Sequence, residues 1–188
     1  ILTGGIGNDI INAGDGYNDI TGGQGNDTIT GGYDRDTYYY NLGDGFDTVT
    51  DPNGKDQIIF GEGISKDDLK FRRNGNDLWL IINNDLTQGM KLVNFFASDD
   101  NKIETLKFAD NSSINLATAG LILDQWDTDD NITGTPYDDV IYGNDGRDTL
   151  SGGSGKDILI GSHGNDTLYG GALSLIHISE PTRLRCIS

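Results

Sequence analysis

Aspartates recur at nine-residue intervals near both ends of this 188-residue chain. In the C-terminal part, four nonapeptides follow one another without a gap, at residues 134–142, 143–151, 152–160 and 161–169. Each begins with glycine and has Asp at position 6 and a large aliphatic residue at position 8. The position-6 residues are Asp139, Asp148, Asp157 and Asp166. Carboxylates at such regular spacing can bind a hard divalent cation or work as acid–base pairs.

The N-terminal end of the chain repeats this pattern. Its units are residues 4–12, 13–21, 22–30 and 31–39, and their position-6 residues are Asp9, Asn18, Asp27 and Asp36. A looser unit, residues 42–50, follows after a slip of two residues and places Asp47 and Val49 in the corresponding roles. Two separate blocks of repeats are therefore expected.

The nonapeptide predicts a glycine-rich turn of six residues followed by a strand of three. Glycine favours the turn because positive φ costs it little. Only position 8 of each strand points inward, because side chains alternate along a strand. Two units then complete one coil, and unit n stacks on unit n+2 at the ~4.8 Å spacing of strands.

Stacking brings the position-6 side chains of successive coils together. Two unit charges ~5 Å apart repel by about 3 kcal/mol at an effective dielectric near 20. A divalent cation removes this repulsion, and carboxylates with turn carbonyls supply only oxygen ligands, which suits calcium better than zinc or copper. The alternative is that these residues only favour positive φ in turns. The expected pairs are Asp9 with Asp27, Asn18 with Asp36, Asp139 with Asp157 and Asp148 with Asp166, of which the Asn18 pair is the weakest.

The repeats resemble the G-G-x-G-x-D-x-U-x signature of the RTX family of calcium-binding nonapeptide repeats. This resemblance implies a parallel β-roll, Ca²⁺ bound at the turns, and an extracellular bacterial protein exported by a type I secretion system. The residues that match the family's metal-binding positions are Gly5, Gly7, Asp9, Asn18, Gly23, Gly25, Asp27, Asp36, Asp139, Gly146, Asp148, Gly153, Gly155, Asp157, Gly164 and Asp166.

Composition excludes several other classes of protein. The net charge of −17 argues against a nucleic-acid partner and against an anionic membrane surface. A single cysteine, Cys186, excludes an internal disulfide framework and a thiolate metal cluster. No apolar run approaches the ~20 residues of a transmembrane span. Because Ile1 lies inside a repeat, we expect the chain to be a fragment of a larger protein.

Residues 51–128 lose the repeat and predict short strands joined by turns. The candidate strands are residues 57–60, 69–73, 78–83, 90–95 and 104–108, with a hairpin signal at Asn74-Gly75. Residues 43–115 resemble the haemolysin-type calcium-binding-related domain found between RTX blocks. Trp79, Phe95 and Phe96 are expected in the core or the cap of a roll, with a ligand groove as the alternative. Trp126 is expected to pack at the entrance of the second block, with a sugar platform as its alternative.

The repeat stops after Gly171, and residues 173–183 resemble a translated sequencing adapter. A native secretion signal and a closing strand are the alternatives for this tail. The expected fold is all-β, with a parallel β-roll in two blocks flanking a small antiparallel β-rich segment. The expected division is 1–50 for block one, 51–128 for the β-rich segment, 129–171 for block two and 172–188 for a non-native tail.

We find no constellation typical of an enzyme. His163 occupies position 3 of a repeat, and neither H-E-x-x-H nor G-x-S-x-G occurs. The expected function is a calcium-binding module that folds when calcium is present, within a secreted toxin, hydrolase or adhesin. The alternative is a calcium-dependent module that binds a glycan or a cell surface. An ice-binding solenoid is disfavoured, because Ile10, Val140 and Ile158 interrupt the threonines at position 7.

Overall fold

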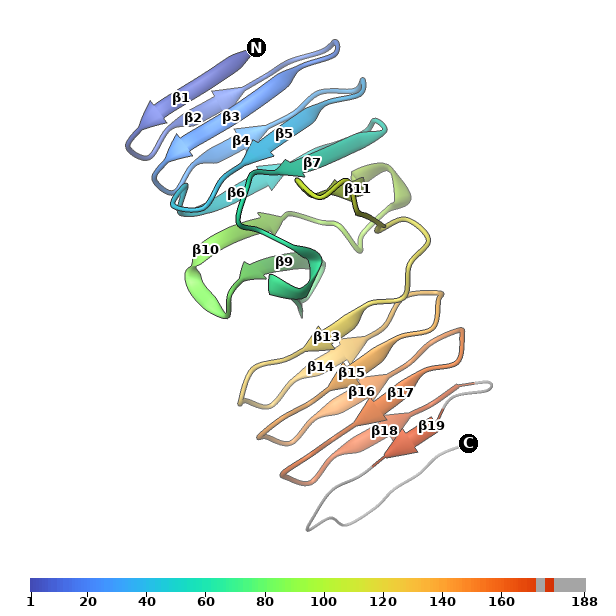
Figure 1. The fold of residues 1–188 in the computed structure, drawn as a ribbon. Helices are drawn as coiled ribbons and strands as arrows, with labels where there is room; N and C mark the ends of the chain where they lie inside the picture. Colours follow the sequence, from blue (N-terminus) through green and yellow to red (C-terminus); the bar gives the residue numbers. More distant parts are fainter. Residues whose placement is uncertain (172–174, 178–188) are drawn as a thin grey trace. The chain divides into compact units, whose positions relative to one another are not determined.

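The computed structural model describes residues 1–171 and 175–177, and these residues form a protein built of β-strands (Figure 1). The described residues contain no α-helix, only the short 3₁₀ helices η1 (Lys66–Asp68) and η2 (Asp99–Asn101). The all-β prediction is confirmed. No helix in the described part of the chain is long and apolar enough to cross a membrane.

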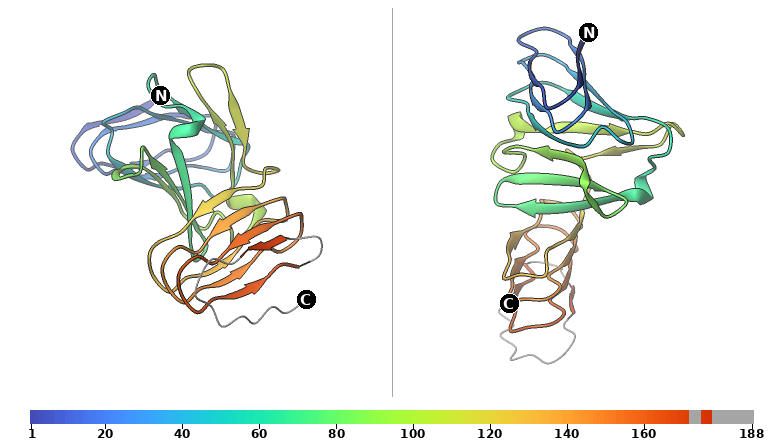
Figure 2. Two further views of the ribbon diagram at one scale, coloured as in Figure 1. Left: turned by 60° about the horizontal axis from the view of Figure 1, so that its bottom comes forward. Right: turned by 90° about the vertical axis from the view of Figure 1, so that its left-hand side faces the viewer.

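The chain divides into two compact units. The first contains Ile1–Lys70 and Asn76–Ala117, and the second contains Phe71–Gly75 and Thr118–Ser188. The turns and strands of each unit are visible from two further directions in Figure 2.

The first unit is a roll of two sheets whose strands alternate along the chain. One sheet has the order β1 (Leu2–Ile6), β3 (Asp19–Gln24), β5 (Thr37–Tyr40), β7 (Asp56–Phe60), β11 (Ile103–Lys107) and β12 (Ser113–Asn115). The other has the order β2 (Ile10–Asn12), β4 (Thr28–Thr30), β6 (Phe46–Thr50), β10 (Asp85–Leu92) and β9 (Asp77–Ile82). The turns that follow β1, β3 and β5 therefore lie at one edge of the roll, and the turns that follow β2, β4 and β6 lie at the opposite edge.

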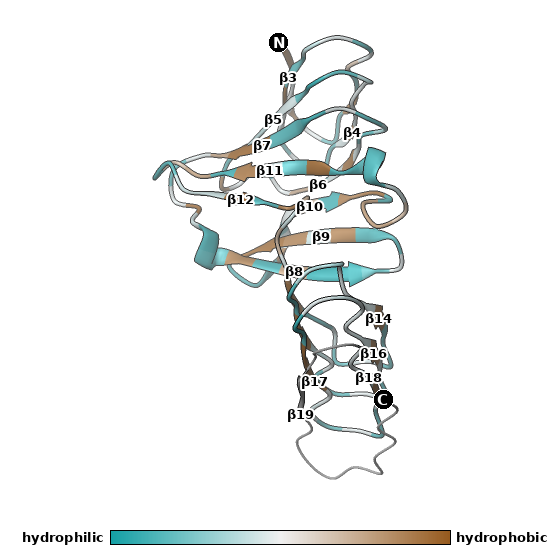
Figure 3. Ribbon diagram, turned by 90° about the vertical axis from the view of Figure 1, so that its right-hand side faces the viewer, coloured by the Kyte–Doolittle hydropathy of each residue, from teal (hydrophilic) through white to brown (hydrophobic). Residues whose placement is uncertain are grey.

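The register confirms that unit n stacks on unit n+2. Ile11 pairs with Ile29, and Ile20 pairs with Tyr38, in parallel strands. Ile29 pairs with Val49, so the two-residue slip before Leu42 is absorbed without loss of register. These position-8 side chains are 0–8% exposed and form the core of the roll. Figure 3 shows hydrophobic residues on the strands and mostly hydrophilic ones along the turns.

The coil continues beyond the repeats that were recognised in the sequence. Residues 51–59 form a sixth turn and strand, in which Ile58 pairs with Tyr38. Asp56 stands at position 6 of this unit, although Asp51 and Pro52 replace its first two glycines. Strand β11 then adds a further parallel neighbour to β7.

Four of the five strands predicted in the middle segment are confirmed within one residue at each end, whereas the strand predicted at 90–95 is β10, which spans Asp85–Leu92. Strands β9 and β10 form an antiparallel hairpin whose turn residues, Asn83 and Asn84, have φ of 53° and 57°. Asparagine tolerates this left-handed region better than most residues. Strand β10 also pairs in parallel with β6, so the hairpin covers the end of one sheet. The Trp79 ring packs 5.1 Å from that of Phe46, and Phe95 is 1% exposed, as expected for a core or cap.

The second unit is a roll of the same kind. One sheet has the order β8 (Leu69–Asn74, which belongs to this unit from Phe71 onward), β13 (Ile122–Asp124), β15 (Val140–Tyr142), β17 (Ile158–Ile160) and β19 (Leu175–His177). The other has the order β14 (Asn131–Thr133), β16 (Thr149–Ser151) and β18 (Thr167–Tyr169). Leu123 and Ile132 fill the position-8 role, so stacking begins two units before Gly134.

The interpretation of residues 172–188 as a non-native tail falls on residues that lie mostly outside the described part of the chain. Within residues 172–188, only the backbone of β19 is described, and it pairs in parallel with β17.

Candidate metal centres

The position-6 residues of successive coils are joined by hydrogen bonds. The backbone N–H of Asp9 donates to Oδ1 of Asp27 at 2.8 Å, and that of Asp27 donates to Oδ1 of Asp47 at 2.9 Å. In the second unit, the N–H groups of Asp130 and Asp148 donate in the same way to Asp148 and Asp166. Each such carboxylate is thereby fixed at the turn by its first oxygen.

The second oxygen of many of these carboxylates is buried without a hydrogen-bond donor. Among the described residues, the carboxylates with such an Oδ2 atom are Asp9, Asp27, Asp56, Asp130, Asp148 and Asp166. A buried carboxylate oxygen without a donor costs free energy unless a cation compensates it. All but Asp56 lie at one edge of their unit, which we call the regular edge: the turns after β1, β3 and β5 in the first unit and after β13, β15 and β17 in the second.

The first glycine of a repeat makes room for this second oxygen. A Cβ at Gly22 would lie 2.2 Å from Oδ2 of Asp27, and one at Gly161 would lie 2.4 Å from Oδ2 of Asp166. The fourth position needs glycine for another reason. Gly164 has φ of 139°, and a Cβ there would lie 1.5 Å from the carbonyl oxygen of Gly146 on the neighbouring coil. Turn carbonyls and carboxylates are thus packed closely between coils.

Burial makes two carboxylates of the regular edges, Asp148 and Asp47, hard to ionise without a counter-charge. Burial, together with the nearby charges of Asp166 and Asp130, raises the pKa of Asp148 to about 6. Burial likewise raises the pKa of Asp47 to about 7, with the charge of Asp27 acting in the same direction. The regular edges are therefore lines of acids that repel one another at neutral pH.

Two turns at the opposite edges satisfy their acids with protein donors. Oδ2 of Asp139 accepts hydrogen bonds from the N–H and the hydroxyl of Thr135, and its Oδ1 accepts one from the N–H of Leu121. Oδ2 of Asp36 accepts a hydrogen bond from the N–H of Gly32 at 2.9 Å. In both turns position 4 is not glycine but Tyr137 or Asp34.

A protein cation lies beside the turn that contains Asp139. The guanidinium of Arg73 donates hydrogen bonds to the carbonyl oxygens of Thr133 and Gly134. Burial lowers the pKa of Arg73, whereas the charge of Asp139 raises it. A fixed positive charge therefore faces the acid at this turn.

The structure brings most of the sequence-predicted acids together in stacked turns. Asp157 also joins a ladder, because its Oδ1 accepts the N–H of Asp139 at 3.0 Å. Asn18 joins a ladder only through its backbone N–H, which donates a hydrogen bond to Oδ1 of Asp36. Sequence reasoning missed Asp56, Asp130 and Glu104, whose carboxylate accepts a hydrogen bond from the N–H of Asp56 at 2.6 Å. Asp130 could have been found from Ile132, which continues the nine-residue series of buried aliphatic residues.

The donor set fits calcium. No group of three or more His, Cys, Asp or Glu side chains able to hold a metal ion is found in residues 1–171. Carboxylates alone are therefore too few, and main-chain carbonyls at the turns must complete the six to eight oxygens that Ca²⁺ prefers. The exposed His163, whose Nδ1 lies 3.4 Å from Oδ1 of Asp145, stands outside the carboxylate ladders.

Comparison with known proteins agrees with this geometry. The RTX calcium-binding nonapeptide repeat matches in four copies, at residues 1–19, 18–47, 127–159 and 142–172. The haemolysin-type calcium binding protein related domain matches residues 77–118, between the two groups of repeats. No curated protein matches the chain.

Among solved structures, one similar chain is the extracellular lipase LipA from Serratia marcescens, at 22% identity and a TM-score of 0.21. The match covers 92% of this chain but only 31% of the lipase chain, so this chain spans about a third of the lipase's length. The stacked coils within each unit, their buried acid ladders and the repeat matches lead to one assignment. The chain belongs to the RTX family of calcium-binding nonapeptide-repeat proteins, and its cofactor is Ca²⁺.

Proposed function

We propose that this chain is a calcium-triggered folding module of a secreted bacterial RTX protein. The observation that carries the proposal is the set of buried carboxylates whose second oxygen has no donor within the protein. The chain would be one part of a larger toxin, hydrolase or adhesin, and any catalytic domain would lie in another part of that protein.

Calcium would be held mainly at the two regular edges. The proposed side-chain ligands are Asp9, Asp27 and Asp47 in the first unit and Asp130, Asp148 and Asp166 in the second. The turn carbonyls near Gly5, Gly7, Gly23, Gly25, Gly146 and Gly164 complete the oxygen set. Asp157, with Gly153 and Gly155, offers a further position at the other edge of the second unit. Asp36 and Asp139 contribute less, because protein donors occupy their oxygens.

Bound calcium supplies positive charge between acids that otherwise repel one another. Without it, like charges on neighbouring coils oppose stacking, and the net charge of −17 favours an open chain. Extracellular calcium modules bind at ~10⁻⁴–10⁻³ M, above the calcium concentration of a cytosol. The chain would therefore remain unfolded before export by a type I secretion system and fold outside the cell, since ligand binding to the folded state stabilises it.

Far-UV circular dichroism of the complete chain tests this proposal. Calcium is added to chelator-treated protein, and magnesium is added to a parallel sample. The expected result is a cooperative coil-to-β transition near millimolar calcium that magnesium does not produce. A β-rich spectrum in chelator at neutral pH, or an equal response to magnesium, would overturn the proposal.

A further inference from the structure

One edge of the first unit departs from the calcium-binding pattern at every turn. At the turns 13–18, 31–36 and 51–56, the departures are Asn18 at position 6, Asp34 at position 4 and Asp51 at position 1. Asp34 instead accepts a hydrogen bond from the N–H of Gly16, and Asp51 accepts one from the hydroxyl of buried Tyr38 at 2.5 Å. Asp56 leaves its Oδ2 without a donor, but Asp34, Asp36 and Asp51 on this edge accept hydrogen bonds from the protein. The outward side chains of this edge are available for another task.

The outward side of this edge carries two adjoining hollows. They have volumes of about 690 and 540 Å³, and they share Arg35, Gly54 and Lys55. Each volume lies within the range of ~300–1,000 Å³ that is usual for ligand sites. Because the hollows adjoin along the stacked coils, the shape suits an extended chain better than a compact molecule.

Two tyrosines stand open at one end of the groove formed by these hollows. Tyr17 is 82% exposed and Tyr33 is 67% exposed, and both line the first hollow. They come from neighbouring turns on the same edge. Exposed aromatic rings beside a hollow are typical of a binding surface, where one face of the ring packs on a ligand and the hydroxyl remains in water.

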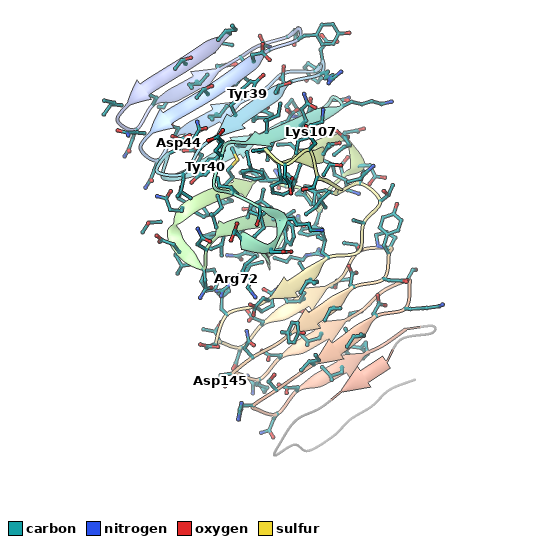
Figure 4. All side chains as sticks on the ribbon, viewed as in Figure 1. Tyr39, Tyr40, Asp44, Arg72, Lys107 and Asp145 are labelled. Carbon is teal, nitrogen blue, oxygen red and sulfur yellow. The ribbon has the colours of Figure 1, made fainter. Side chains whose placement is uncertain are left out.

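Side chains that donate hydrogen bonds and side chains that also accept them line both hollows. Within the described residues, the exposed Arg35 and Lys55 have no hydrogen bond or ion pair in the protein. Thr105 and Asn115 extend the lining along the sheet beyond Gln57, with which Thr105 pairs in register. Lys107 lines the second hollow; like Tyr39 it pairs in register with Ile59, and Figure 4 labels both residues.

The charges within the groove nearly cancel. Asp19, Asp34, Arg35 and Lys55 line the first hollow, and the second adds Asp56, Glu104 and Lys107, so the groove holds four acids and three cations. A polyanion would meet the field of a chain with net charge −17, and a polycation would meet the unpaired cations. A hydroxyl group both donates and accepts hydrogen bonds, so it can pair with either kind of group without burying an unpaired charge.

We propose that this groove binds an uncharged, linear saccharide chain, with sugar rings packed on Tyr17 and Tyr33 and hydroxyls bonded to Arg35, Lys55 and Asp19. The module is then a glycan-binding surface as well as a calcium-dependent fold. This inference does not rest on calcium-triggered folding, because the proposed calcium ligands of the first unit, Asp9, Asp27 and Asp47, lie at the opposite edge.

Isothermal titration calorimetry of the complete chain in saturating calcium tests the site. The probes are neutral hexasaccharides of glucose, mannose and xylose, an acidic oligogalacturonate and a single-stranded oligothymidylate. We expect at least one neutral hexasaccharide to bind. The double variant Tyr17→Ala/Tyr33→Ala and the variant Arg35→Gln should each bind it at least tenfold more weakly.

Matched controls separate the groove from general effects on the fold. Tyr137→Ala removes an exposed tyrosine from a turn of the second unit, and Lys156→Gln changes a cation at the same repeat position as Arg35. Both should bind the neutral chain like the unmodified protein, and circular dichroism should show all variants folded in calcium. Failure of every neutral probe to bind, stronger binding of the acidic or nucleic-acid probe, or equal loss in the controls would each overturn the proposal.

Discussion

The same residue at repeat position 6 has two different environments in this protein. Asp148 leaves Oδ2 buried without a donor, whereas both oxygens of Asp139 accept hydrogen bonds from Leu121 and Thr135. The difference arises from the turn, since Tyr137 replaces glycine at position 4 and the N–H of Thr135 then points to the carboxylate. We therefore propose that an acid at position 6 binds calcium only where the turn leaves one of its oxygens without a donor.

We predict that Asp148→Asn lowers the number of calcium ions bound at saturation by at least one. The amide keeps an oxygen to accept the N–H of Asp130, so the hydrogen bond between coils survives. The charge that attracts calcium is lost, as is an anionic oxygen ligand. Equilibrium dialysis followed by elemental analysis of calcium per chain measures the effect.

Asp139→Asn is the matched comparison. Its amide nitrogen would face the N–H of either Thr135 or Leu121, which leaves a buried donor unsatisfied at a cost of ~1–3 kcal/mol. The urea midpoint in saturating calcium should therefore fall, while the bound calcium stays unchanged. Equal calcium stoichiometry in the Asp148 and Asp139 variants would contradict the distinction between the two edges.

At the scale of elements, the strands were more predictable than the turns. The nine-residue repeat places one buried residue in each strand, so the pairing of Ile11 with Ile29 follows from the sequence. The two-residue slip before Leu42 likewise predicts that Val49 lies next to Ile29. The units around Leu123 and Asp56 were missed because their turns lack most of the glycines. The hydrogen bonds that distinguish the two edges depend on turn conformation, which a list of residue types does not specify.

Strand β8 provides the second unit with two cations, Arg72 and Arg73. Arg72 lies over the ring of Trp126, 3.9 Å from its centroid, and Figure 4 labels Arg72. This contact covers one face of the ring, which favours packing over a sugar platform at Trp126. The neighbouring Arg73 donates to the carbonyls of Thr133 and Gly134. Both arginines stabilise the start of the roll without calcium.

We predict that Arg73→Met lowers the stability of the calcium-saturated protein by ~1.5–3 kcal/mol, the range for hydrogen bonds from a charged group. Arg73→Lys should cost less, because it keeps the charge but loses the fork of donors. Arg147→Met is the surface control, since its ion pair with Asp129 is largely exposed and worth at most ~1 kcal/mol. Urea unfolding followed by circular dichroism measures all three, and equal losses in the Met variants would contradict a specific role for Arg73.

At the scale of the whole molecule, acid burial links folding to protons as well as to calcium. Burial raises the pKa of Asp56 to about 8, of Asp47 to about 7, and of Asp51 and Asp148 to about 6. The unfolded chain has carboxyl pKa values near ~3.9. Between these limits the folded, metal-free chain binds more protons than the unfolded chain. The stability that these four acids contribute is therefore complete below about pH 4 and is lost as pH rises toward 8.

We accordingly predict that protons partly replace calcium. In calcium-depleted buffer the chain should be folded to a greater extent at pH 5 than at pH 8, with the free energy of unfolding at least ~1 kcal/mol larger after allowance for solvent screening. In saturating calcium the trend should reverse, because protons compete with calcium for the same carboxylates. Urea titrations at both pH values, each with chelator and with calcium, measure the four stabilities. A metal-free stability that is constant or rises from pH 5 to pH 8 would show that these acids are solvated in the folded chain, and the ladders would then have no electrostatic cost for calcium to relieve.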